Sequence, residues 1–268
     1  MKKVLTIAGS DSCGGAGIQA DIKTMSAMGV YGMSVITAVT AQNTLGVSGV
    51  FEMPKDIVEE QLKAIFEDIE VDSVKIGMLS GIEIIKTVTD SLKKYKAENI
   101  VIDPVMLSKN KYKLLKEEAF TEMQRFIGIG TLVTPNIPEA EVLASMKINN
   151  EEDIIEAAKR IQKFGVKNVL VKGGHREDDC TDILLMENGE IIKYFGTRID
   201  AVNTHGTGCT LSSAIASLLA KGNSIEESVR GGKEYITQAI KDSFSIGSGI
   251  GPLGHFIDIY KKTGIDFE

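Results

Sequence analysis

The sequence predicts an α/β protein with a mostly parallel, doubly wound sheet, helices on both of its faces (three layers, α/β/α) and an antiparallel edge. Short apolar runs rich in β-branched residues alternate with helical patterns along the chain of 268 residues, and such alternation builds right-handed βαβ units. Two late apolar runs are joined by a turn that contains Asn188-Gly189, which is typical of a hairpin and indicates the antiparallel edge. Because no repeat, low-complexity segment or linker interrupts this order, we expect one domain over residues 1–268.

Strands are expected where short apolar runs end in turn residues, and helices where apolar residues recur at helical spacing. The predicted strands span residues 4–9, 34–41, 73–78, 99–103, 131–134, 168–172, 182–186 and 191–195. The predicted helices lie near residues 17–29, 54–69, 82–95, 115–127, 138–145, 151–164, 207–221 and 224–243. The helix at 151–164 is the clearest, because Asn150 can cap its start and Gly165 can end it. Ligands of such sheets bind beyond the carboxyl ends of the strands, so we expect the chemistry directly after these runs.

Composition and charge favour a soluble protein that binds small molecules. Hydrophobic residues make up 43% of the chain and charged residues 25%, which is ample for a globular core. The net charge of −7 argues against a nucleic-acid backbone or an anionic membrane as the partner. Cys13, Cys180 and Cys209 do not cluster, which argues against disulfides and zinc and favours a reducing cytoplasm. No stretch approaches the ~20 predominantly apolar residues of a membrane span.

The first glycine-rich segment, residues 9–21, follows a strand and opens a helix. Its residues 15–20 match the pattern G-x-G-x-x-A of dinucleotide-binding folds. That interpretation also requires an Asp or Glu about 20 residues further on, to bind a ribose hydroxyl. No acidic residue lies between Asp21 and Glu52. The sequence therefore argues against a dinucleotide-dependent oxidoreductase and leaves open whether these glycines bind a ligand or merely make a tight turn.

The second glycine-rich segment, residues 205–221, is more informative. Gly206, Thr207 and Gly208 precede a helical pattern, and the first N–H groups of such a helix lack partners and carry the positive end of its dipole. Glycines there let the backbone approach an anion closely. Cys209 lies in the same field, which should lower the pKa of its thiol and favour the thiolate. We therefore expect an anion site with a thiol beside it.

Several roles for Cys209 must be weighed. As a metal ligand it lacks partner ligands, and as a redox thiol it lacks a resolving cysteine in the sequence. A covalent nucleophile needs a base, and imidazole is offered only by His175, His205 and His255. A buried filler residue is a credible alternative. A polar group that lies beside a bound phosphate fits best.

Polar residues also follow three other predicted strands. Asn136 and Glu139 could reach a metal-bound water, but Asn-x-Pro-Glu is equally a helix capping box, and the sequence does not separate these alternatives. Lys172 could reach a phosphate as a flexible point charge. Asp103 suits a metal or substrate contact. For Lys172 and Asp103 the alternative is an ordinary solvated charge on a loop.

These segments together closely resemble the hydroxymethylpyrimidine/phosphomethylpyrimidine kinases of thiamine biosynthesis, which belong to the ribokinase superfamily. The resemblance runs from about residue 4 to residue 252, nearly the whole chain. The motifs that carry it occur in the family's order: IAGSDS and GGAGIQAD on either side of Cys13, VTAQNT, KIGML, DPVM, TPN-PEA, KGGH and NTHGTGC. The resemblance implies a ribokinase-like fold.

The resemblance also implies a role for individual residues. The acceptor pocket would be lined by Gly9, Ala16, Asp21, Thr40, Gln42, Met78 and Val105, with Gln42 pairing to the amino and nitrogen edge of a pyrimidine. Asp103, Asn136 and Lys172 would contact the ATP phosphates, and Glu139 would hold Mg²⁺ through water. Gly206, Thr207, Gly208 and Cys209 match the anion hole, where sugar kinases of the superfamily carry an aspartate base in place of Cys209.

Two positions depart from the family's pattern. After DPVM the family usually continues with a Lys-Ser-Gly type of flap, whereas this chain has Ser108-Lys109-Asn110-Lys111-Tyr112. Cys13 stands where the family often has serine.

The resemblance implies a cytoplasmic, homodimeric kinase that uses ATP and Mg²⁺. It would phosphorylate 4-amino-5-hydroxymethyl-2-methylpyrimidine and then convert the monophosphate to the pyrophosphate. A pyridoxine/pyridoxal kinase of the same branch is the alternative of the same class. The alternatives of other classes are a dinucleotide-binding oxidoreductase, disfavoured by the missing ribose acid, and a non-catalytic phospholigand-binding domain, disfavoured by the many polar strand ends.

Overall fold

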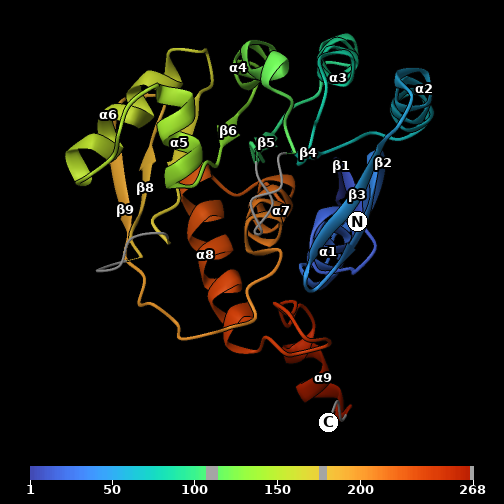
Figure 1. Cartoon of the computed structure of the whole chain (residues 1–268), viewed down its shortest axis with the longest axis vertical. Helices are drawn as coiled ribbons and strands as arrows, with labels where there is room; N and C mark the ends of the chain where they lie inside the picture. The colour runs from blue at the N-terminus through green and yellow to red at the C-terminus, as the bar shows by residue number, and fades with distance from the viewer. Residues whose placement is uncertain (107–113, 175–179, 266–268) are drawn as a thin grey trace.

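The computed structural model describes residues 1–106, 114–174 and 180–265, and within them nine strands form one sheet with helices on both faces (Figure 1). The strands are β1 (Lys3–Asp11), β2 (Tyr31–Asn43), β3 (Gly46–Glu52), β4 (Ser73–Ile76), β5 (Ile100–Ile102), β6 (Leu132–Val133), β7 (Asn168–Val171), β8 (Asp182–Leu185) and β9 (Ile191–Tyr194). The α-helices are α1 (Gly17–Ala27), α2 (Lys55–Phe66), α3 (Ile82–Lys94), α4 (Phe120–Ile127), α5 (Ile137–Ala144), α6 (Glu151–Gln162), α7 (Thr207–Ala220), α8 (Ile225–Lys241) and α9 (Ile257–Thr263). A short 3₁₀ helix spans Glu117–Ala119. The predicted fold class is confirmed.

The strand order is β3-β2-β1-β4-β5-β6-β7-β8-β9. The strands from β2 to β7 in this order run parallel, whereas β3 pairs antiparallel with β2, and β8 and β9 extend the opposite edge in antiparallel pairs. The chain passes from β1 to β2 on one side of β1 and later returns to β4 on its other side. A crevice opens at the carboxyl ends of strands where the order reverses in this way, and ligands of doubly wound sheets bind there.

Both edges of the sheet are antiparallel, where the sequence predicts one, and the sequence analysis predicts neither β3 nor α9. β3 is half exposed and contains Gly46 and Gly49, so it lacks the apolar alternation that marks a strand. Its hairpin depends on a side chain instead, because the Leu45 and Gly46 amides donate to Asn43 Oδ1 at 2.9 and 3.2 Å. In α9 the one buried residue among those described is Ile257, so its apolar pattern is weak.

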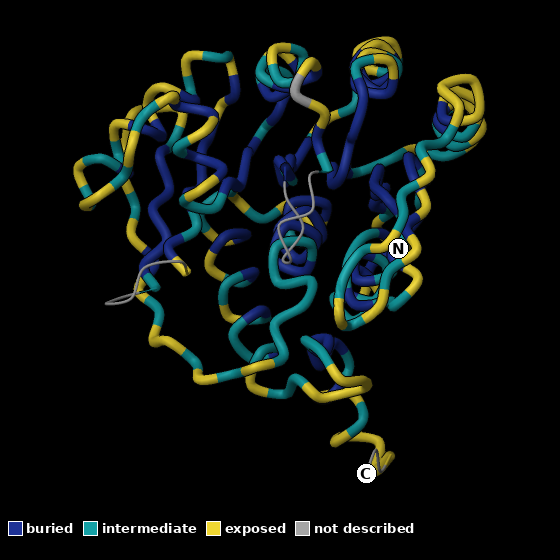
Figure 2. The backbone as a smooth tube through the Cα atoms, in the orientation of Figure 1, coloured by how far each residue is buried: buried dark blue, intermediate teal, exposed yellow. Residues whose placement is uncertain are grey.

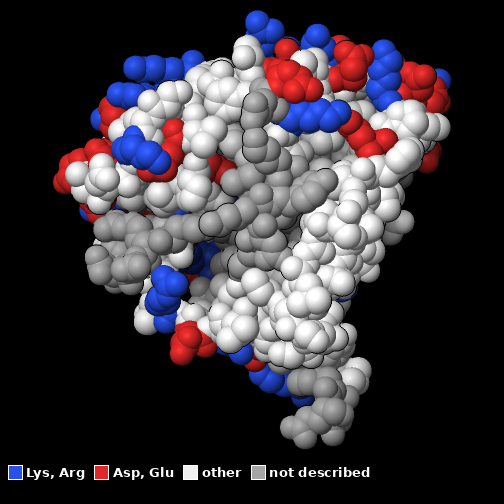
Figure 3. Space-filling model, viewed as in Figure 1, with Lys and Arg blue, Asp and Glu red and all other residues white. Residues whose placement is uncertain are grey.

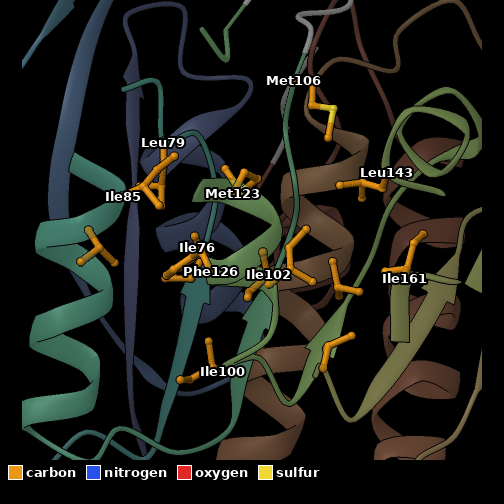
Figure 4. Close-up of a cluster of buried hydrophobic side chains, with 14 of the residues drawn as sticks. Ile76, Leu79, Ile85, Ile100, Ile102, Met106, Met123, Phe126, Leu143 and Ile161 are labelled. Carbon is orange, nitrogen blue, oxygen red and sulfur yellow. The ribbon is translucent and has the colours of Figure 1, made fainter. Parts of the chain in front are cut away.

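Two hydrophobic cores lie on the two faces of the sheet. Side chains of β1 alternate between them: Leu5 and Ile7 pack with α2 to α6, whereas Val4 packs with α1, α7 and α8. Figure 4 shows the first core, in which Ile76 and Ile102 from neighbouring strands lie beside side chains of α3 and α4. Both faces of the parallel strands are therefore buried, as Figure 2 shows along the centre of the molecule.

Helix α7 is buried along most of its length, from Thr210 to Ser217 without interruption. It lies against β1, β4, β5 and the helices α1 and α8 (Figure 1). A helix enclosed in this way has a fixed position, so its first turn is held in place at the carboxyl ends of the central strands.

Charged side chains gather over α2, α3, α4 and α6 in the view of Figure 3, whereas the surface around β2 and β3 carries few. Within the described part of the chain, none of the helices is both long enough and apolar enough to span a membrane.

Candidate active site

A cavity of about 580 Å³ lies at the carboxyl ends of the parallel strands, where the strand order reverses. Its lining comes from the carboxyl-terminal parts of β1 and β2, from the segments after β1, β4, β5, β6 and β7, and from the start of α7 with the residues just before it. The described residues that line it are Ala8, Gly9, Ser10, Asp11, Ala16, Gly17, Thr40, Gln42, Met78, Asp103, Val105, Met106, Leu114, Asn136, Pro138, Glu139, Val142, Lys172, Thr204, His205, Gly206, Thr207, Gly208 and Cys209. One cavity thus joins both glycine-rich segments and all the polar strand ends.

Asp11 shapes the first glycine-rich segment. Its Oδ2 accepts hydrogen bonds from the amides of Gly15 and Ala16 at 3.0 and 2.8 Å, and its Oδ1 accepts from the amide of Cys13 at 2.9 Å. Burial opposes ionisation of this carboxyl, but the hydrogen bonds from His205 and from the Ala16 amide outweigh it and hold the pKa of Asp11 below its usual value. The loop is therefore folded around a carboxylate.

At the start of α7, glycines let the backbone pack closely against neighbouring segments. Gly206 caps the helix with φ +84°, and a Cβ there would lie 1.8 Å from the carbonyl oxygen of Gly15, so only glycine fits. At Gly208 a Cβ would lie 3.0 Å from Asp103 Oδ2 and 3.3 Å from Lys172 Nζ. Residues 206–209 line the cavity together with Lys172, and the first amides of a helix lack partners within the helix, an arrangement that favours an anion.

Lys172 remains charged at this position. Its Nζ lies 2.8 Å from Asp103 Oδ1, and both side chains are largely buried. Burial disfavours the ammonium, but the neighbouring Asp103 and Glu139 carboxylates outweigh it and raise the pKa of Lys172. A phosphate that enters the cavity would therefore meet a lysine that is already protonated.

Asn136 and Glu139 form the capping box of α5. The Glu139 amide donates to Asn136 Oδ1 at 2.9 Å, and the Asn136 amide donates to Glu139 Oε2 at 2.9 Å. Burial raises the pKa of Glu139 to about 7, against the opposing effect of Lys172. Glu139 also lines the cavity, so the capping role does not remove its carboxylate from reach of a ligand.

The donor set fits a hard divalent cation that is held mainly by phosphates. Among the described residues, no group of three or more His, Cys, Asp or Glu side chains forms a metal site by itself. Mg²⁺ bound with a nucleotide needs only one or two carboxylates, because phosphates and waters supply its other oxygen ligands. Asp103 and Glu139 are the carboxylates that line the cavity near Lys172 and could fill this place.

Cys209 lies on the cavity wall at the start of α7, as the sequence predicts, but its acidity differs from the expectation. Burial raises the pKa of the thiol to about 11, and the charge of Lys75 opposes this only in part. The prediction that the helix field favours the thiolate is therefore wrong. Burial and the negative charges of Asp21 and Asp103 raise the pKa by more than nearby positive groups lower it.

The structure places Asp21 elsewhere than the resemblance implies. Asp21 is fully buried and does not belong to the described lining of the cavity. Its Oδ2 accepts from Lys75 Nζ at 2.8 Å and from Thr6 Oγ1 at 2.6 Å, and its Oδ1 accepts from Ser213 Oγ at 2.8 Å. Through these contacts Asp21, which belongs to α1, is linked to β1, β4 and α7 in the protein interior.

At the acceptor end, Gln42 lies near the end of β2, beside a register shift between Ala41 and Gln42. Its amide lies 3.1 Å from His205 Nε2 and 3.2 Å from Thr40 Oγ1. His205 Nε2 lies 3.0 Å from Asp11 Oδ2. The predicted ring-binding glutamine is therefore part of a network that reaches both glycine-rich segments.

The cavity brings together all the predicted site residues except Asp21. Sequence analysis misses Asp11 and His205 as site residues. Both could have been found, because Asp11 is the first acidic residue after the first strand and His205 opens the HGTG segment. The predicted flap at residues 108–112 and the weighed His175 lie outside the described residues.

The model of the phosphomethylpyrimidine kinase family matches residues 11–254 of the chain. The chain belongs to this family. A hydroxymethylpyrimidine/phosphomethylpyrimidine kinase of Haemophilus influenzae is 44% identical over 96% of this chain and 97% of its own length. A bifunctional protein of thiamine biosynthesis from Geobacter sulfurreducens is 47% identical over 95% of this chain, but the chain spans only about half (52%) of that protein. The expected family and the expected phosphotransferase class are confirmed.

A solved structure shares the fold closely. The ADP complex of Bacillus subtilis pyridoxal kinase superposes with a TM-score of 0.89 at 38% identity, over 96% of this chain and 98% of the other. The ribokinase-like fold is therefore confirmed. Membership of a kinase family also removes the dinucleotide-dependent oxidoreductase and the non-catalytic binding domain as alternatives.

Proposed function

We propose that the chain transfers the γ-phosphoryl group of Mg²⁺-ATP to the hydroxymethyl group of 4-amino-5-hydroxymethyl-2-methylpyrimidine, and then phosphorylates the monophosphate to the pyrophosphate. One observation carries the proposal: a single cavity holds an amide suited to an aminopyrimidine edge, Gln42, and an anion site at Gly206 to Cys209. The names of the full-length relatives agree with this substrate class.

Catalysis on this site is positioning and charge stabilisation, as in other phosphoryl transfers. The amides at the start of α7 would bind the transferred group, and Lys172 would neutralise the charge that develops on it. Bound Mg²⁺ would supply further neutralisation of the phosphate oxygens, and Asp103 and Glu139 would hold it, with Glu139 acting directly or through water. Asn136 would orient Glu139 through the capping box.

On the acceptor side, we infer that Gln42 pairs with the ring and that Gly9, Ala16, Thr40, Met78 and Val105 enclose it. Ala16, Met78 and Val105 supply apolar contact, which suits the faces of an aromatic ring. Cys209 would lie beside the reacting oxygen, and its thiolate form would take the proton when the acceptor is an alcohol.

A coupled assay of ADP release, run side by side with the pyrimidine alcohol, its monophosphate and pyridoxal, tests the proposal. We expect turnover of both pyrimidines at kcat/KM values above that of pyridoxal. The competing candidate is a pyridoxal kinase, favoured by the similarity to the Bacillus subtilis enzyme. A higher kcat/KM for pyridoxal would establish that candidate and refute the proposal.

We also propose that the protein is a cytoplasmic homodimer with one catalytic domain. Cys13, Cys180 and Cys209 are all free thiols, which agrees with a reducing compartment. The β2–β3 ribbon carries Val39 and Phe51 as directly opposed, exposed side chains. Two copies could cover this apolar pair by packing their ribbons together.

A further inference from the structure

His205 lies between a carboxylate and an amide, and the hydrogen positions there can be worked out. Its Nε2 is 3.0 Å from Asp11 Oδ2 and 3.1 Å from the side-chain amide of Gln42. An ionised carboxylate only accepts hydrogen bonds, and Asp11 already accepts three backbone amides. A lone pair on Nε2 would repel Asp11 at this distance. Nε2 therefore carries a hydrogen.

The orientation of the Gln42 amide follows from this hydrogen. A protonated Nε2 has no lone pair in the ring plane and cannot accept from an NH₂ group 3.1 Å away. Its one hydrogen can instead be shared between Asp11 Oδ2 and the Gln42 amide oxygen, so the oxygen of Gln42, not its NH₂ group, faces the imidazole. The contact of Gln42 with Thr40 agrees with this orientation. Thr40 Oγ1 donates its one hydrogen to the Ser10 carbonyl at 3.0 Å. It can therefore only accept a hydrogen bond from the end of the Gln42 amide that lies 3.2 Å away. That group is then the NH₂ of Gln42, since amide oxygen and nitrogen are assigned from their partners.

The imidazole has little freedom to turn away. Its side chain is 12% exposed, and the His205 amide donates to the Gly251 carbonyl at 3.1 Å. The ring packs on Gly15, where a Cβ would lie 2.3 Å from the ring carbon Cδ2. His205 is therefore a fixed donor against which the mobile amide of Gln42 must orient.

We propose that His205 is a positioning residue that sets the hydrogen-bonding polarity of Gln42 and thereby the preference for an aminopyrimidine edge. The Gln42 oxygen keeps one lone pair free of His205, and its nitrogen keeps one hydrogen free of Thr40. The cavity thus receives an acceptor beside a donor, which complements an amino group beside a ring nitrogen. Without His205 the amide can rotate and accommodate rings with a different edge. The inference rests on the proposed function.

A double-mutant cycle tests the coupling. His205→Phe keeps an aromatic ring on Gly15 and removes the donor, and Gln42→Leu removes the amide. We expect each single variant to raise the KM for the pyrimidine alcohol about tenfold and to lower its kcat/KM relative to pyridoxal about tenfold, with the KM for ATP unchanged. In the Gln42→Leu background, adding His205→Phe should not change the ratio of the two kcat/KM values, pyrimidine alcohol over pyridoxal, any further. His205→Gln, which restores an N–H donor, should recover part of the preference.

A second measurement needs no substitution. In the wild-type protein, two-bond ¹H–¹⁵N correlations of the imidazole should identify Nε2 as a protonated nitrogen. An unprotonated Nε2 overturns the inference, and so does an equal, additive loss of preference when His205→Phe is combined with Gln42→Leu. If wild-type protein does not phosphorylate the pyrimidine alcohol at all, the proposed function falls and the inference with it. If the wild-type protein phosphorylates the pyrimidine alcohol but the effects of the two substitutions are additive, the inference about His205 is refuted and the proposed function stands.

Discussion

Cys209 shows how far a local sequence pattern can predict a residue. A thiol in the first turn of a helix predicts a depressed pKa, and the position of the residue at the anion site follows from the same pattern. Its environment does not follow from the pattern, because burial and the charges that act on its pKa (Lys75, Asp21 and Asp103) come from three other segments of the chain. Burial raises the pKa to about 11, so the group is a thiol at neutral pH.

Truncation of Cys209 should separate the two proposed reactions. An alcohol needs a base, whereas a phosphate monoester with a second pKa of about 6 is already largely ionised, and the backbone amides of the anion hole survive in Cys209→Ala. We expect the substitution to slow transfer to the alcohol by roughly 10²–10⁴ and transfer to the monophosphate far less. Single-turnover rates at saturating ATP and Mg²⁺ measure both. Equal losses would mean that the thiol serves the anion hole or the packing of α7.

The same base has a pH signature. Because the pKa of Cys209 is about 11, its thiolate fraction rises about tenfold per pH unit from neutral pH toward that value. The wild-type rate with the alcohol should therefore rise with pH in this window. The Cys209→Ala variant and the monophosphate reaction should lack the rise.

At the scale of elements, α5 combines a helix cap with a cavity carboxylate. Glu139→Gln can keep the contact with the Asn136 amide while it removes the charge. We expect the half-saturating Mg²⁺ concentration to increase and the maximal rate to fall, with the fold intact. The matched control is Glu227→Gln, because Ser224 and Glu227 form a second capping box on α8 outside the described cavity lining. If Glu139→Gln keeps the wild-type Mg²⁺ dependence, the cap alone explains the motif.

Glu139 also predicts a pH dependence of stability. Burial raises its folded-state pKa from 4.5 to about 7, so the folded protein binds this proton more tightly than the unfolded chain does. The resulting stabilisation is complete below pH 4.5 and is lost as pH rises through about 7. In Glu139→Gln this part of the pH dependence should disappear from urea unfolding measured between pH 5 and 8 without Mg²⁺.

A buried ion pair joins Asp21 of α1 to Lys75 of β4, and hydrogen bonds of the same carboxylate add β1 and α7. Burial disfavours the ammonium of Lys75, but Asp21 outweighs it, and the pKa of Lys75 is raised. Asp21→Asn would leave that charge buried without its partner, which should cost about 3–5 kcal/mol of unfolding free energy. The matched control is Glu83→Gln, which removes an exposed pair with Lys55 and should cost below about 1 kcal/mol.

Kinetics with the same variant decide between two roles of Asp21. Because Asp21 lies outside the described cavity lining, the folded fraction of Asp21→Asn should keep a nearly normal KM for the pyrimidine alcohol. A fully stable variant with a raised KM would instead support the acceptor contact that the family resemblance implies.

Over the whole molecule, short apolar runs that alternate with helical patterns were enough to predict the parallel strands, and the rule that ligands bind at carboxyl ends located the site. What the sequence could not provide were contacts between segments far apart in the chain. The pairing of His205 with Asp11 depends on how α7 packs against the sheet, and the burial of Asp21 depends on Lys75 and Ser213. The β3 strand likewise depends on a turn held by Asn43 and on pairing with β2.

The assembly state gives the last prediction. Val39 and Phe51 are opposed in the β2–β3 register and are 44% and 65% exposed. A single exposed apolar residue is ordinary, but this cross-strand pair belongs to the β2–β3 ribbon, around which the surface carries few charges (Figure 3), and it is the contact face that we propose. Light scattering after size exclusion should give twice the chain mass for the wild-type protein and one chain mass for Phe51→Lys. Phe195→Lys, at an 82% exposed position beyond the ribbon, should remain dimeric. A wild-type monomer at micromolar concentration would refute the homodimer. Because β2 also carries Thr40 and Gln42, dissociation should loosen the acceptor pocket and raise the KM for the pyrimidine alcohol more than that for ATP.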